Sequence, residues 1–131
     1  VRSFGGPVGL GFLSGAVCLL IGLGGAVFPD QAVHFAHMFF VGGAAQFVLT
    51  ISVHVIQSHG GHGALSPGRR KALWAVVILV LCAALTRATA AVWPHIYVSH
   101  LAYAALLFIL ALGIWFAFFG RLIFIPTKEG K

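Results

Sequence analysis

The sequence predicts an all-α integral membrane protein, a four-helix bundle with both termini in the cytoplasm. Of its 131 residues 60% are hydrophobic and only 8% are charged, and the mean hydropathy is +1.04. This composition is too apolar for an ordinary soluble domain. Long stretches contain no Lys, Arg, Asp or Glu, and a membrane-spanning helix needs about 20 apolar residues. The chain length suits a single domain.

The charge-free stretches leave room for four spans. They run from Ser3 to Pro29, from Gln31 to Gly68, from Ala72 to Thr86 and from Ala88 to Gly120. We therefore predict helices over about 7–28, 33–57, 71–92 and 96–125, within one transmembrane domain covering 1–131. The prolines lie at or outside the ends of these spans, where they do not interrupt helical hydrogen bonds.

The positions of the positive charges predict how the chain is oriented in the membrane. All Lys and Arg residues except Arg87 fall on the side of the termini and the middle loop: Arg2, Arg69, Arg70, Lys71, Arg121, Lys128 and Lys131. By the positive-inside rule this side is cytoplasmic, and the chain is expected to be a multi-pass membrane protein. The net charge of +6 is thereby explained. No basic face is interleaved with stacking aromatic residues, so nucleic acid is not an expected partner.

The first helix is rich in glycine. Gly11 and Gly15 form a small-xxx-small pair, and Gly22 lies on roughly the same face. Such a face lets another backbone or a flat cofactor approach closely. We expect it to serve in packing, including self-association or contact with other membrane subunits.

The second helix carries polar residues through an apolar span. His34 and His37 lie about 60° apart in its first turn. Gln46, Thr50, His54 and Gln57 form a polar stripe further along, and such a stripe must face protein, water or a ligand. The glycine-rich loop that follows adds His59 and His62. His54, His59 and His62 are a candidate metal set, although H-x4-H-x2-H matches no standard zinc spacing. The alternative is that these histidines are interfacial and solvent-accessible.

The third helix contains one intramembrane charge, Arg87, near its end. Arg87 either snorkels to the surface or pairs with an anionic group such as a haem propionate or Asp30. The fourth helix starts directly after Pro94 with His95 and His100. With a length of about 30 residues it is tilted or projects beyond the lipid.

The histidines predict a haem site. His37 and His100 each lie about one turn into their helices, so they are at similar depth. A bis-histidine b-type haem needs one imidazole from each of two facing helices. His34 and His95 are substitute ligands, and Arg87 is the expected propionate partner. Copper suits the same imidazoles, and a site without metal remains open.

Hydrolytic chemistry is not expected. The only acids are Asp30 and Glu129, and no serine, cysteine or carboxylate constellation is present. A redox or accessory subunit is therefore favoured over a stand-alone enzyme.

From His37 onward the sequence resembles the carboxy-terminal part of the NnrS family. The resemblance rests on HMFFVG (37–42), SHGGH (58–62), LTRATAAVWP (85–94) and the closing helix with Trp115 and Arg121. In this register the positions that match residue for residue are His37, Gly42, His59, Gly61 and Arg87, whereas His54 and His62 stand where the family pattern has arginines.

The resemblance implies a polytopic bacterial membrane protein that contains haem and copper and is linked to the response to nitric oxide. Members of the family are much longer, so this chain is expected to complete its packing with copies of itself or other subunits. The favoured function is a small haem b-binding subunit that transfers electrons in a respiratory or nitrogen-oxide-related redox complex. The alternatives are a cofactor-free structural subunit and a copper-handling protein.

Overall fold

The computed structural model describes residues 6–59 and 64–125, which fold into four helices long and apolar enough to span a membrane. The spans are Pro7–Gly24, Pro29–His59, Pro67–Thr89 and Pro94–Phe124. The described residues contain no β-strand. The predicted all-α membrane bundle is confirmed, and the cytoplasmic placement of its termini stays a prediction.

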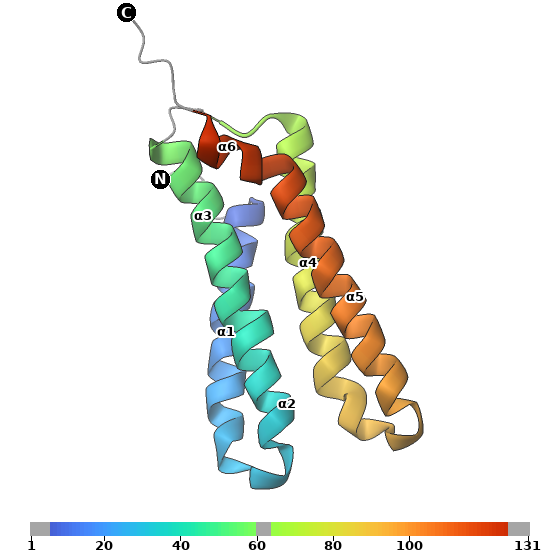
Figure 1. Cartoon of the computed structure of the whole chain (residues 1–131). Helices are drawn as coiled ribbons and strands as arrows, with labels where there is room; N and C mark the ends of the chain where they lie inside the picture. Colours follow the sequence, from blue (N-terminus) through green and yellow to red (C-terminus); the bar gives the residue numbers. More distant parts are fainter. Residues whose placement is uncertain (1–5, 60–63, 126–131) are drawn as a thin grey trace, which may run out of the picture.

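The four spans form two helical hairpins (Figure 1). In the first, α1 (Pro7–Gly24) is followed by α2 (Ala32–His37), a π-helical segment (Met38–Ala45) and α3 (Gln46–His59). In the second, α4 (Pro67–Thr89) is followed by α5 (Tyr97–Trp115), a second π-helical segment (Phe116–Gly120) and α6 (Arg121–Phe124). The starts of α1 and α4 and the ends of α3 and α6 share one end of the bundle, which we call the basic end because Arg69, Arg70, Lys71 and Arg121 lie there.

Short 3-10 turns close both hairpins at the opposite end. They are Gly25–Val27 with Pro29–Gln31 in the first hairpin and Ala90–Val92 with Pro94–Ile96 in the second. In each hairpin a proline opens the second 3-10 turn, where its missing N–H costs no helical hydrogen bond. The two proline-led turns start the second and fourth spans at the same end of the molecule.

Helix α4 begins about one turn earlier than the predicted position 71. Pro67 occupies the first helical position, and Ser66 caps the helix by accepting a hydrogen bond from the backbone N–H of Arg69 at 3.5 Å. A serine cap followed by proline is a strong start signal. Arg69, Arg70 and Lys71 are therefore helical residues.

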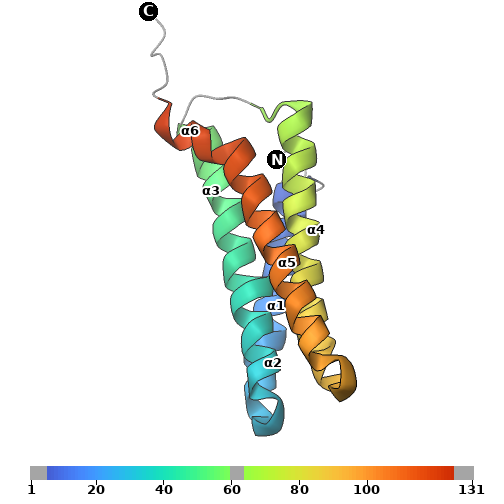
Figure 2. The same ribbon diagram turned by 45° about the vertical axis from the view of Figure 1, so that its right-hand side comes forward.

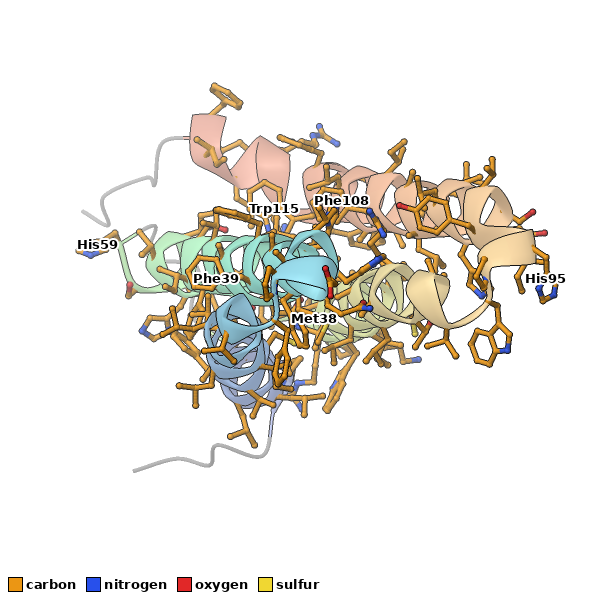
Figure 3. All side chains as sticks on the ribbon, turned by 90° about the horizontal axis from the view of Figure 1, so that it is seen from below. Met38, Phe39, His59, His95, Phe108 and Trp115 are labelled. Atoms are coloured by element: carbon orange, nitrogen blue, oxygen red, sulfur yellow. The ribbon has the colours of Figure 1, made fainter. Side chains whose placement is uncertain are left out.

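The main core surrounds α4. Leu73, Val76, Val77 and Val80 are at most 1% exposed and pack against α3 and the last span. From the last span Trp115 donates its indole N–H to the carbonyl oxygen of Leu49 at 3.1 Å, which satisfies a polar group that burial would otherwise leave unpaired. The last span thus leans toward α3, as Figures 2 and 3 show.

The glycine face of α1 packs within the chain. A Cβ on Gly11 would meet Thr50, one on Gly15 would meet Phe47, and one on Gly22 would lie 2.7 Å from the backbone nitrogen of Phe39. Close approach of a backbone is the expected use of such glycines. The neighbour is the second span of the same chain, so these glycines serve packing within the chain, and self-association through this face stays a prediction.

The polar stripe of the second span divides between core and surface. Gln46 and Thr50 are each 1% exposed, whereas His54 is exposed. The amide nitrogen of Gln46 donates to Ser14 Oγ at 3.2 Å and to the carbonyl oxygen of Val77 at 3.3 Å. Gln46 therefore joins α1, α3 and α4 at the centre of the bundle.

Candidate functional site

Arg87 is a buried cation near the end of α4. The residue is 7% exposed, and its Nη1 donates to Nδ1 of His34 at 3.0 Å. Its guanidinium carbon also lies 5.4 Å from the centre of the Tyr97 ring, within cation–π distance. Since the guanidinium is only a donor, His34 Nδ1 must accept, and the proton of this neutral imidazole is on Nε2.

The hairpin geometry brings these residues together from three spans. His34 lies in the first turn of α2, Arg87 in the last turn of α4 and Tyr97 at the start of α5. The rings of His34 and Tyr97 meet edge to face, with centroids 6.3 Å apart. The proline-led turns place all three at the same end of the bundle, away from the basic end.

The positive charge of Arg87 has no anionic partner in the described part of the chain. The sequence contains only two acids, Asp30 and Glu129. Asp30 is exposed in the turn before α2 and forms no ion pair with Arg87, and Glu129 lies outside the described residues. Of the expectations for Arg87, neither snorkelling nor a pair with Asp30 agrees with its burial and contacts. A buried charge without a counter-charge is costly.

A cavity of about 560 Å³ opens beside Arg87 between the two hairpins. Its lining residues come from the second span, α4 and α5: His37, Val41, Ala83, Arg87, Val98, Leu101, Ala102, Ala104, Ala105 and Phe108. All except His37 and Arg87 are apolar, and the volume is typical of sites for cofactors or drug-sized ligands.

His37 is the histidine that lines this cavity. Its Nδ1–H donates to the carbonyl oxygen of Val33 at 2.8 Å, so in the neutral imidazole Nε2 is the nitrogen without a proton. Histidines that bind a metal usually donate their other ring N–H to a carbonyl or carboxylate in this way. His37 therefore has the tautomer of a metal ligand.

The structure does not bring His100 to the cavity. Its neighbours Leu101 and Ala102 line the cavity, but the His100 ring stacks on Trp93, with centroids 6.0 Å apart and an angle of 11° between the planes. Its Nδ1–H donates to the carbonyl oxygen of Ile96 at 3.2 Å. The expected pair of His37 and His100 is therefore not assembled around one space in this conformation.

The two substitute ligands lie elsewhere. His34 uses Nδ1 to accept from Arg87, so that nitrogen is not available to a metal. His95 is exposed in the 3-10 turn before α5, and Figure 3 shows it projecting from the periphery of the bundle. Neither residue lines the cavity.

The histidines expected near the basic end do not form a metal site in the described residues. His54 and His59 are exposed on α3, and Figure 3 shows His59 pointing away from the bundle. His62 lies outside the described residues. Within 6–59 and 64–125, no three His, Cys, Asp or Glu side chains are close enough to hold a metal ion.

Two features of the site were missed by sequence reasoning. The ring of Tyr97 forms the cation–π contact with the guanidinium of Arg87, and the π-helical segment begins directly after His37. The position of Tyr97 in the first turn after Pro94, level with Arg87 across the hairpin, was a usable signal. The π-helix has only the weak signal of Gly42 and Gly43, although such segments are frequent at functional sites.

The acceptor role of His34 can be tested by substitution. We expect His34→Leu to lower the free energy of unfolding by about 1–3 kcal/mol, because it leaves a buried guanidinium donor unpaired. His34→Asn should cost less than about half as much, because the Asn Oδ1 takes the approximate position of Nδ1 and keeps an acceptor. Thermal unfolding in detergent measures both, and equal losses would contradict the assigned hydrogen bond.

Comparison with known protein families identifies one match that covers both hairpins. A family model described as NnrS protein matches residues 6–126. This match also includes the first span, beyond the resemblance that starts at His37. No curated protein and no solved structure matches the chain significantly.

Proposed function

Because the family model covers most of its length, the chain belongs to the NnrS family, and on this premise we propose that it is a small b-type haem subunit of a bacterial inner membrane. The family is linked to the response to nitric oxide. The proposed role is electron transfer within a respiratory or nitrogen-oxide-related redox complex. The haem would occupy the cavity lined by His37 and Arg87.

The observation that carries this proposal is the buried charge of Arg87. Its contacts, His34 and Tyr97, are neutral, and the described residues offer it no carboxylate. An anion from outside the chain would offset the cost of burying this charge. A haem propionate has the required charge, and the planar guanidinium binds carboxylates with two parallel hydrogen bonds.

The rest of the cavity fits a haem chemically. His37 offers an unprotonated Nε2 beside an apolar wall built largely of alanine, leucine and valine. Small side chains such as Ala83, Ala102 and Ala105 leave room for a flat group. When bound, haem supplies one-electron chemistry, and its potential depends on the axial ligand, burial and hydrogen bonding.

This chain's own residues would determine how the haem is held. His37 would ligate the iron and Arg87 would orient a propionate, with His34 and Tyr97 fixing the guanidinium. The described conformation brings no second histidine to the cavity. A second ligand from His100 would require its ring to leave Trp93.

A reduced-minus-oxidised visible spectrum of the purified protein tests the proposal. We expect a sharp alpha band, and we expect Arg87→Gln to retain several-fold less haem because it removes the propionate partner. Arg121→Gln is the matched control, since it removes an exposed cation far from the cavity. Stoichiometric copper without the band would support a copper-handling protein. A spectrum with neither signal would leave a structural subunit.

A further inference from the structure

A second cavity, which we call the α1 groove, lies at the basic end and has no part in the haem proposal. It has a volume of about 560 Å³ and is lined entirely by glycine and apolar residues from α1 and the residue before it, α3 and α4: Gly6, Gly9, Leu10, Phe12, Leu13, Ala16, Phe47 and Trp74. From Gly6 to Ala16 it follows α1 for about 15 Å. This is half the thickness of a hydrocarbon core of about 30 Å, so the groove spans roughly one leaflet.

The walls of the α1 groove are aromatic. Phe12 of α1 and Phe47 of α3 meet edge to face, with ring centroids 5.4 Å apart. Trp74 forms the side that belongs to α4, about two turns from the start of that helix. Tryptophan is favoured at the level of the lipid headgroups, where one part of the ring is apolar and another is polar.

Two cations lie one turn above Trp74. Arg70 and Lys71 precede it by four and three residues, which places them within about 40° and 60° of its direction on α4. Both are exposed. Long cationic side chains at this level extend along apolar surface and keep their charge in the headgroup region. Among the described residues the only acid, Asp30, lies at the opposite end of the bundle.

We propose that the α1 groove binds an anionic phospholipid. One acyl chain lies along α1 between the aromatic walls, and the phosphate headgroup lies between Arg70 and Lys71. The charge complementarity identifies this occupant, because basic pockets between transmembrane helices bind acidic headgroups. A neutral detergent or apolar peptide would fill the groove but leave both cations without a partner. The site is independent of the haem.

The test measures lipid binding to the purified full chain by native mass spectrometry. The probes are phosphatidylglycerol, phosphatidylcholine and soluble glycerol phosphate. We expect the wild type to prefer phosphatidylglycerol over phosphatidylcholine, and the double variant Arg70→Gln/Lys71→Gln to lose about tenfold or more of that preference. Arg121→Gln is the control. Arg121 is an exposed cation at the same end of the bundle but on α6, so its loss should leave the preference for phosphatidylglycerol unchanged. Both cations are exposed, so stability without lipid should stay at the wild-type level.

A second variant tests the apolar half of the site. Ala16→Leu fills the inner end of the α1 groove and keeps both cations, and we expect it to weaken phosphatidylglycerol binding several-fold. Equal binding of the two lipids by the wild type would overturn the proposal. The same conclusion would follow if Arg121→Gln reduced the preference as much as the double variant, or if glycerol phosphate alone bound as tightly as the lipid.

Discussion

Replacing His37 with alanine is expected to reduce the haem content of the purified protein by about tenfold or more. Among the described residues it is the only histidine that lines the cavity beside Arg87, and its Nε2 is free to bind iron. Loss even of a residue that supports a metal ligand costs about 10–100-fold in affinity, so loss of the ligand itself should cost at least that much. The ratio of haem absorbance to protein measures the effect.

His95→Ala is the matched control for this experiment. It removes an exposed imidazole at the same end of the bundle that does not line the cavity, so its haem content should equal that of the wild type. Full haem retention by His37→Ala would refute His37 as the ligand.

His100→Ala then tests whether the haem iron has a second histidine ligand. Unchanged haem agrees with its stacking on Trp93, and loss of haem would show that α5 turns to bring His100 inward.

The fold could be predicted because a membrane imposes few, strong requirements. The gaps between charges located four spans, and prolines at their ends indicated where the chain turns. The start of α4 was placed late because Arg69 and Arg70 were read as part of the loop and the helix was started at Lys71. Ser66 and Pro67 instead start the helix, and the cations extend into the headgroup region from its first turns.

The site was harder to predict because sequence spacing fixes depth but not the facing of neighbouring helices. The equal depth of His37 and His100 was inferred from helix geometry, yet the rotation of α5 depends on which residues pack against α4. Ala104, Ala111 and Trp115 are the buried residues of α5, and they leave His100 beside Trp93. The residue pattern of α5 alone does not reveal which of its faces packs against α4.

Helix geometry also explains why the polar stripe of the second span ends at the surface. Each step of four residues advances the direction of a side chain by about 40°, so His54 points about 80° away from Gln46. Gln46 and Thr50 remain inside the bundle, and His54 has turned out of it. The π-helical segment before Gln46 changes the phase again, so the facing of His37 does not follow from the register of α3.

Gly22→Ala is expected to lower the free energy of unfolding by about 3 kcal/mol or more, the upper part of the range for overpacking. The added Cβ would lie 2.6 to 2.8 Å from Cβ, the backbone nitrogen and Cα of Phe39. These atoms belong to the π-helical segment and cannot move aside by a change of rotamer. The two spans would have to separate locally. Thermal or denaturant unfolding in detergent measures the loss.

Gly113→Ala provides the matched comparison, because a Cβ there meets no atom within 4 Å and the residue lies inside α5. Alanine is the better helix former, so this variant should be neutral or slightly more stable. Equal losses in the two variants would show that the packing of Gly22 on Phe39 has no special role.

His37 precedes Phe39 by two residues, so separation at Gly22 should also displace the imidazole. The haem affinity of Gly22→Ala should therefore fall with its stability, whereas in His37→Ala it falls alone.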